Sequence, residues 1–383
     1  MMVSRAAIVA GVAALLLTGS GGAAPPRPDQ SRVLWQGPTL AGEAMVWAEA
    51  SGGTGSLHLW TSRRSDRIVY RSDSLALTRP FASSRKLIAF ERTFPSCPPP
   101  PGHVCPEGAD ALVGPLTGPY RTLARPHTCF LPTVGNALAL DGGVAAYLEL
   151  DCTRQRLRVV ARDVERAERP RVLRDAAFSG GCCRDIAIAG RYVAWSDGRD
   201  VVVYDRLARR VGYRARIGPR GINVDFGFDL QRDGKLAVAF RLVELARGGP
   251  TTIAWLSPSR PLLHLLPFRG SDTRIRIAGD RIAFERYVRP TKSALVVADL
   301  DRSARTLARF EESTRLGGFD FDGQRLVWAS EHVTARRVDC PPPGQGRPCV
   351  RRQSGATSLW LRDISARAPR LIARLKFDDA FPR

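Results

Sequence analysis

The chain has 383 residues, a formal net charge of +21 and 44% hydrophobic residues. That hydrophobic fraction is ordinary for a globular protein and argues against a disordered chain. Only four of the 58 basic residues are lysine, and the sequence contains no run of basic residues. We therefore attribute the charge to arginine-rich codon usage. Nucleic acid is not expected as a partner, although a basic surface could attract anionic glycans or lipids.

Residues 1–24 have the order of a secretory signal peptide. Arg5 precedes an apolar run at 6–17, and the small residues 20–24 suit a cleavage site. The run is short for a membrane span of about 20 residues, so we expect cleavage and a secreted, periplasmic or cell-envelope protein. An uncleaved N-terminal anchor is the alternative. Residues 25–30 are expected to form a flexible lead-in, and no transmembrane segment is expected in the mature chain.

One pattern of short strands and tight turns recurs along the rest of the chain, most clearly at 185–209. In each copy the second strand ends in an aromatic residue. The seven aromatics are Trp47, Phe90, Tyr147, Trp195, Phe240, Phe284 and Trp328, spaced 43, 57, 48, 45, 44 and 44 residues apart. A repeat of about 40–50 residues with four strands per copy is typical of a β-propeller. One thin sheet cannot bury both of its faces alone, so neighbouring sheets stack and one large aromatic per copy fills the space between them.

The turn before the aromatic strand carries glycine in six of the seven copies, as expected where a tight hairpin needs positive φ. These glycines are Gly42, Gly142, Gly190, Gly234, Gly279 and Gly323. We predict an all-β fold over residues 31–376: a seven-bladed β-propeller with four antiparallel strands per blade. The blades are expected at about 38–73, 80–125, 135–174, 184–215, 223–267, 273–310 and 317–375, with a tail at 377–383. A β-sandwich is the alternative, but sandwiches do not repeat one four-strand pattern seven times.

Two segments compete for the position that closes the propeller. Residues 33–35 read as a fourth strand without a blade, while 370–375 already supplies a fourth strand for blade seven. We expect the N- and C-terminal strands to pair, with 33–35 at the edge of blade seven. Whether that segment replaces or extends 370–375 stays open. A closed propeller has no free sheet edges in the blade direction, so we expect a monomer.

Eight cysteines in an exported chain predict disulfides. Cys97 and Cys105 enclose one proline-rich loop, and Cys340 and Cys349 enclose another. Because no cysteine motif has zinc-type spacing, we expect a bridge in each loop and no metal site. The pairing is open for the other four cysteines, which are Cys129, Cys152, Cys182 and Cys183. We favour one bridge from each of the first two to the adjacent pair.

Propeller topology predicts that all eight cysteines lie on one face. They fall in loops from second to third strands or from one blade to the next, and those loops share a face. The two proline-rich loops would flank blade one and wall the mouth of the central channel. Long braced loops on a rigid scaffold are usual places for binding. The alternative is that they only cover blade edges.

An acidic residue follows the aromatic strand in six copies, at Glu49, Glu91, Glu149, Asp197, Glu285 and Glu331. Copy five has Arg241 instead. A carboxylate rim could bind a cation or a sugar, or supply an acid/base pair. The alternative is ion pairing with neighbours such as Arg92 and Arg286. Strand parity favours this alternative, because successive residues point to opposite sides of a blade.

Nucleophilic catalysis has little support in the sequence. His58 and His264 fall inside predicted strands and are expected to pack there. No Gly-x-Ser-x-Gly elbow and no calcium-binding loop is present, so no catalytic residue, metal or cofactor is expected. The candidate ligand-binding residues are Glu91, Arg92, His103, His127, Glu149, Glu285 and Glu331.

Two copies of the repeat resemble TolB-type, WD-repeat-like propeller units. They are 277–284 (IAGDRIAF) with 295–300 (LVVADL), and 321–328 (FDGQRLVW) with 358–363 (SLWLRD). The resemblance covers nearly the whole mature chain and implies the fold. It does not imply one function, because such repeats also occur in enzymes and in the propeller caps of peptidases. TolB has an additional N-terminal domain that we do not find in this sequence, so its envelope role is not carried over.

The sequence thus predicts an exported, non-catalytic binding or scaffold module. Its partner would be a protein or an anionic glycan of the cell envelope, bound through the cysteine-braced face. The alternative is a polysaccharide lyase or hydrolase with its site at the channel mouth. An enzyme predicts a tight cluster of histidine, arginine and acid with perturbed pKa values at that mouth. A binding module predicts a broad polar or aromatic surface.

Overall fold

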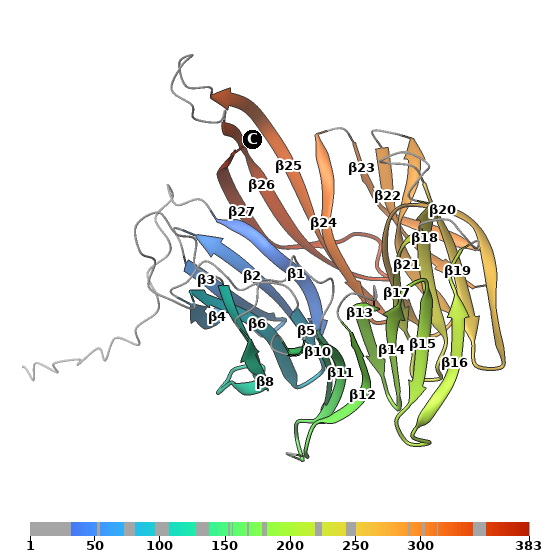
Figure 1. The fold of residues 1–383 in the computed structure, drawn as a ribbon. Coiled ribbons are helices and arrows are strands. Elements are labelled where there is room, and N and C mark those ends of the chain that lie inside the picture. The colour runs from blue at the N-terminus through green and yellow to red at the C-terminus, as the bar shows by residue number, and fades with distance from the viewer. Residues whose placement is uncertain are drawn as a thin grey trace, which may run out of the picture. The chain divides into compact units, whose positions relative to one another are not determined.

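The computed structural model describes residues 32–51, 54–72, 81–95, 107–127, 138–151, 154, 156–166, 168–177, 182–218, 224–242, 250–289, 292–300, 303–311, 313–339 and 350–382 (Figure 1). The regular elements in these ranges are β-strands. The expected signal peptide and lead-in lie outside them. Within the described ranges, no helix is long and apolar enough to cross a membrane.

The strands form antiparallel sheets of consecutive strands, numbered here as four-strand units along the chain. Unit one contains β1 (Val33–Ala41), β2 (Ala44–Ser51), β3 (Thr54–Thr61) and β4 (Arg64–Ser72). Unit two contains β5 (Phe81–Ser83), β6 (Leu87–Pro95), β7 (Glu107–Pro115) and β8 (Arg121–His127). Unit three contains β9 (Leu138–Asp141), β10 (Val144–Asp151), β11 (Arg156–Asp163) and β12 (Arg171–Ala177). Unit four contains β13 (Cys182–Ala189), β14 (Tyr192–Asp197), β15 (Asp200–Asp205) and β16 (Arg210–Arg216).

Units five and six share one long strand and therefore one seven-stranded sheet. Unit five contains β17 (Val224–Leu230), β18 (Leu236–Leu242), β19 (Thr251–Ser257) and the first part of β20 (Arg260–Ala278). Unit six contains the second part of β20, then β21 (Arg281–Arg289), β22 (Lys292–Asp299) and β23 (Ala304–Phe310). Gly270 pairs with both Thr251 of β19 and Arg286 of β21, and the register with β21 shifts between Gly270 and Ile275. Unit seven contains β24 (Thr314–Phe321), β25 (Arg325–Asp339), β26 (Val350–Asp363) and β27 (Arg370–Pro382).

The repeat predicted from the sequence coincides with these units. Each of the seven marker aromatics lies on the second strand of its unit, and six are almost fully buried, while Phe240 is half-buried. The six turn glycines all have positive φ, as predicted: Gly42, Gly142, Gly190, Gly234, Gly279 and Gly323. Burial of one large aromatic contributes about 2–3 kcal/mol, so each second strand carries a large share of its unit's packing energy.

Among the described residues, buried apolar side chains form seven clusters, and each cluster joins two units. Six of the clusters join units that follow one another along the chain. The seventh joins unit seven to unit one, and it includes Trp47 and Met45 from β2 together with Val327 from β25 and Leu359 from β26. Every unit therefore has a packing partner on both faces.

Polar contacts reinforce the junction between units one and seven. Asp320 Oδ2 in β24 accepts hydrogen bonds from Thr39 Oγ1 at 2.7 Å and from the Leu40 backbone N–H at 2.9 Å. The backbones approach so closely that a Cβ on Gly318 would lie 2.6 Å from the Gly37 carbonyl oxygen. In the part of the chain that the structure describes, a backbone hydrogen bond from Arg32 N–H to Lys376 O at 2.9 Å links the residue before β1 to β27.

The predicted pairing of residues 33–35 at the edge of unit seven is wrong. Val33 and Leu34 pair with Ala50 and Glu49 of β2, so this segment extends β1. The physical reason is that β2 is longer than the part of β1 at 39–41. Its remaining edge is free for backbone pairing, and residues 33–34 pair with it. At the other end of the chain, residues 377–382, expected as a tail, continue β27 alongside β26.

Candidate functional site

A rim of charged cross-strand pairs lies where second strands end beside the starts of first strands. The antiparallel pairing of these strands brings opposite charges together in units one, five, six and seven. The pairs are Arg32–Glu49 at 2.7 Å, Arg241–Asp225 at 2.8 Å, Arg274–Glu285 at 3.4 Å and Arg315–Glu331 at 2.5 Å. We call these eight residues the charged rim. Three of the six acids predicted to follow the aromatic strands, Glu49, Glu285 and Glu331, are thus bound to arginines of the neighbouring strand.

Unit five shows the same pair with the charges exchanged. Arg241 takes the position of the acid, and Asp225, its cross-strand partner, takes that of the arginine. The ion-pair interpretation of the acids is therefore supported, but the predicted partners differ. Arg92 binds Asp110 at 2.6 Å, and the guanidinium of Arg286 lies over the Phe268 ring.

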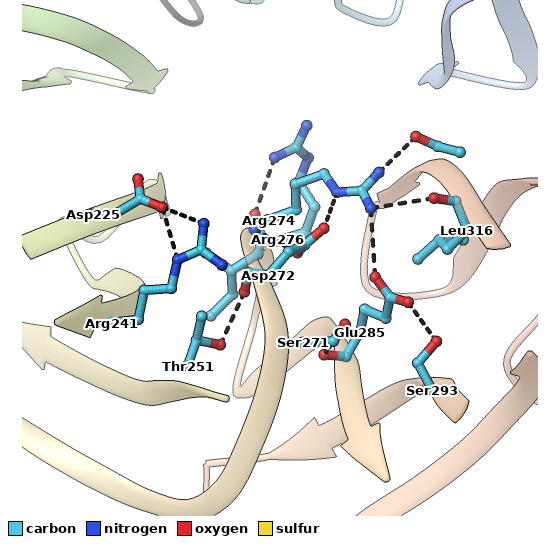
Figure 2. A network of polar contacts seen from close by, with 12 residues as sticks. Asp225, Arg241, Thr251, Ser271, Asp272, Arg274, Arg276, Glu285, Ser293 and Leu316 are labelled. Carbon is cyan, nitrogen blue, oxygen red and sulfur yellow. Dashed lines mark hydrogen bonds and ion pairs between the residues drawn. The ribbon is translucent and has the colours of Figure 1, made fainter. Parts of the chain in front are cut away.

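Arg274 is the centre of the rim between units six and seven (Figure 2). Its guanidinium donates to the backbone oxygens of Gly317 at 2.6 Å and Leu316 at 3.3 Å, and it contacts the carboxylates of Glu285 and Asp272. The two terminal nitrogens tie β20 to β21 and β24, while Nε binds Asp272 within β20 itself. Burial raises the pKa of Glu285, although bonds from Ser293 and Arg274 oppose this shift.

A second group of charges lies deeper along the first strands. Arg276 in β20 donates to Asp320 Oδ1 at 3.0 Å, while Asp229 in β17 accepts the Ile277 backbone N–H at 2.9 Å. Burial raises the pKa of Asp229, and the nearby Arg276 charge opposes the shift. Because Asp320 also binds Thr39, this group connects first strands from four units.

A buried histidine in unit one has both ring nitrogens engaged. His58 Nδ1 lies 2.8 Å from Asp66 Oδ1, and Nε2 lies 3.0 Å from Ser56 Oγ and 3.6 Å from Glu49 Oε1. Its ring stacks on Trp47 at 5.2 Å. The similar stacking of His264 on Trp255 supports the expectation that both histidines have packing roles.

The serine–histidine–aspartate order resembles that of a hydrolase triad, but the surroundings oppose that chemistry. Ser56 lies inside β3 directly across from Glu49, so a negative carboxylate stands where acyl transfer needs oxyanion donors. A metal site fits no better. Ligand atoms of Glu49, His58 and Asp66 lie within 4.8 Å of one another, yet the Glu49 carboxylate already accepts three hydrogen bonds from Arg32 and Trp47.

Glu91 differs from the rim acids, because no ion pair to its carboxylate is seen within the described ranges. The neighbouring Arg92 turns to Asp110 and to the Tyr70 hydroxyl. Burial, with a smaller contribution from the Asp110 charge, raises the pKa of Glu91 to about 7. A carboxyl group that exchanges its proton near neutral pH has the property required of a general acid or base.

The remaining predicted site residues divide into three groups. Glu149 is half-buried opposite Arg158. The backbone of His127 ends β8, and its side chain is outside the description, as are those of Cys182 and Cys183 in β13. Six cysteines and one histidine lie outside the described residues: Cys97, Cys105, Cys129, Cys152, Cys340, Cys349 and His103. The disulfides and the cysteine-bearing face therefore stay predictions.

Sequence reasoning missed the basic half of the rim. A usable signal was present, because the opposite charge precedes the second-strand residue by 16 or 17 residues in three of the four pairs. That spacing equals one hairpin in this repeat. Arg276 and Asp320 are 44 residues apart and belong to two different units. No local sequence pattern predicts their contact.

Comparison with known proteins supports the fold and no more. No family model and no curated protein matches this sequence. A solved structure from a study of two prolyl endopeptidases aligns with a TM-score of 0.50 and 12% identity, covering 91% of this chain and 50% of that one. The β-propeller domain of the trilobed protease from Pyrococcus furiosus, described as having an open velcro topology, aligns with a TM-score of 0.40 and 10% identity, covering 77% and 97%. The chain spans about half the length of the endopeptidase, and that alignment supports a likeness of fold.

Proposed function

We propose that the chain is an exported, seven-bladed β-propeller that closes on itself and serves as a non-catalytic binding module. Closure is supported by the seven apolar clusters, which follow one another in cyclic order and return from unit seven to unit one. The ring closes by face-to-face packing of these two units, with each unit built from consecutive strands. A secreted or cell-envelope location follows from the signal-like residues 1–24.

The charged rim is the observation that carries the binding role. Its carboxylates, the residues that first suggested acid/base chemistry, are held by arginines that fix strand ends in place. Such a rim presents fixed alternating charges on a rigid scaffold, which suits recognition of a protein or an anionic glycan. The proline-rich loops between Cys97 and Cys105 and between Cys340 and Cys349 are expected at the same end.

Binding by this end can be tested with the mature, oxidised chain from residue 25. Candidate partners, recovered from the native envelope by cross-linking and then purified, and anionic polysaccharides are titrated against the immobilised chain. One variant replaces both proline-rich loops with glycine–serine linkers. The matched control replaces Arg166, which is 77% exposed in a turn at the other end of unit three. We expect the loop variant to weaken binding at least about tenfold, or 1.4 kcal/mol, and the control to bind normally. Equal affinities of the three proteins would overturn the proposal.

Glu91 gives specific support to a second candidate, a polysaccharide lyase or hydrolase. Its raised pKa and its neighbour Asp110 are what an acid/base site would need. Depolymerisation of a polysaccharide panel, with Glu91→Gln as the inactive variant, distinguishes this candidate. Turnover that disappears in the variant would replace the binding proposal by the enzymatic one.

A further inference from the structure

An open cavity of about 600 Å³ lies between units four and five, at the end of the strands opposite to the charged rim. Two tight turns of unit five form one side of it, between β17 and β18 and between β19 and β20. Its lining residues are Tyr192, Asp233, Lys235, Trp255, Ser257, Pro258, Ser259 and Arg260. A volume of this order is in the usual range for a small-molecule site.

The cavity has a rigid aromatic lining. Trp255 is only half-buried, and the His264 ring stacks on it at 4.5 Å with an interplanar angle of 19°, which fixes the indole plane. Tyr192 lies against the β17–β18 turn, where Gly234 has φ +85°. A Cβ there would lie 2.8 Å from Pro258 and 3.1 Å from the Tyr192 ring. The two turns and the aromatic ring therefore meet at a position that only glycine allows.

Hydrogen-bonding groups of both kinds surround the aromatic surface. The Asp233 side chain is 48% exposed and receives the Lys235 backbone N–H at 2.9 Å on one oxygen. The hydroxyls of Ser257 and Ser259 lie 3.1 Å apart, and the side chain of Arg260 is exposed beside them. The lining thus offers a carboxylate acceptor, two hydroxyls and a guanidinium donor in the same cavity as the indole ring of Trp255.

The charges at the cavity do not favour a strongly anionic ligand. The ammonium group of Lys235 is already shared between Asp280 at 2.7 Å and Asp233 at 3.4 Å. Arg260 is then the one cation of this lining without a carboxylate close by among the described residues. A phosphate group would meet two cations, Lys235 and Arg260, and two carboxylates, Asp233 in the lining and Asp280 bound to Lys235, so these four charges cancel.

From this combination we infer that the cavity binds a pyranose ring of a neutral saccharide. A pyranose has one face of C–H groups, which packs on a flat aromatic ring. Its edge of hydroxyls needs both donors and acceptors, which Arg260, the two serines and Asp233 supply. The inference is independent of the charged rim and of the partner proposed for it.

The test is titration of the mature full-length protein with neutral hexoses and N-acetylhexosamines, a uronate and a proline-rich peptide. Affinity is measured by calorimetry and by tryptophan fluorescence. We expect a neutral sugar to bind with a Kd of about 1–10 mM, corresponding to roughly 3–4 kcal/mol, and more tightly than the uronate. Trp255→Ala should weaken sugar binding at least about tenfold. Trp255→Phe keeps an aromatic face and should weaken sugar binding less.

Two aspartates provide a matched comparison. Asp233 and Asp280 both bind Lys235, but only Asp233 lines the cavity. Asp233→Asn should weaken sugar binding about five- to tenfold, and Asp280→Asn should leave it within about twofold. If Trp255→Ala does not fold, Trp255→Phe and the two asparagine variants decide. No sugar binding up to about 100 mM, equal effects of the two asparagine variants, or binding of the peptide alone would each overturn the inference.

Discussion

Asp320 permits a direct energetic test of the junction between units one and seven. Its carboxylate in β24 accepts hydrogen bonds from Thr39 Oγ1 and the Leu40 N–H in β1, and from Arg276 in β20. Asp320→Asn keeps the size of the side chain but removes its charge. It also places an amide N–H₂ against groups that are themselves donors.

The expected loss can be worked out from these contacts. A hydrogen bond to a charged group contributes about 1.5–3 kcal/mol, and the Asp320 side chain is only 17% exposed. Asparagine keeps one acceptor oxygen, so we expect Asp320→Asn to reduce the free energy of unfolding by about 2–4 kcal/mol. Asp322 is the matched control. Its carboxylate binds Gln324 and Arg325 in its own turn, so Asp322→Asn should cost about 1 kcal/mol.

The assay is urea unfolding followed by tryptophan fluorescence, in a double-mutant cycle with Thr39→Val. Thr39 and Asp320 are 281 residues apart in sequence, so they can couple only if units one and seven are in contact. We expect a coupling free energy of about 1–2 kcal/mol for Thr39 with Asp320, and none for Thr39 with Asp322. Coupling below about 0.3 kcal/mol in the first cycle would refute the junction.

Three further predictions concern stability. Glu49→Gln should lower the free energy of unfolding by about 3 kcal/mol, because Glu49 is 2% exposed. Glu331→Gln should lower it by less than about 1 kcal/mol, because the arginine partner of Glu331 is 68% exposed. Equal losses in urea unfolding would contradict the assigned burial. The pKa of Glu91 is raised to about 7 from a usual value of 4.5. Between pH 4.5 and 7 the folded state therefore binds a proton that the unfolded state has lost. The free energy of unfolding should fall by up to about 3 kcal/mol as the pH rises through this range. Glu91→Gln should flatten that pH profile, and an unchanged slope would assign the titration to another group. Gly318→Ala should lower the free energy of unfolding by about 1–3 kcal/mol, because the new Cβ would lie 2.6 Å from a backbone oxygen. Gly212→Ala should leave it unchanged, because its Cβ would lie 3.4 Å from the nearest backbone oxygen. Equal melting temperatures of the two variants would refute the close approach at Gly318.

The repeat could be predicted from the sequence because it depends on interactions within single hairpins. An aromatic such as Trp195 and a turn glycine such as Gly190 recur at fixed spacing, and each requires only its own hairpin. The closing strand could not be placed in the same way. Its position depends on how far β2 extends beyond residues 39–41, and on the bond between Arg32 and Glu49.

The sites were less predictable, because they depend on contacts between units. The acid positions were visible, but partners were sought among sequence neighbours such as Arg286, while the observed partner of Glu285 is Arg274 on the preceding strand. The cavity beside Trp255 is formed by two turns of unit five and by Tyr192 of unit four. No single segment of the sequence contains that arrangement.

The central proposal is that seven four-stranded units form a ring that closes by packing unit seven on unit one. A crystal structure of the mature chain tests this most directly. The proposal predicts seven units around one axis, with Trp47 packed on Val327 and Asp320 within hydrogen-bonding distance of Thr39. Six or eight units, or a gap between the first and last of them, would contradict it.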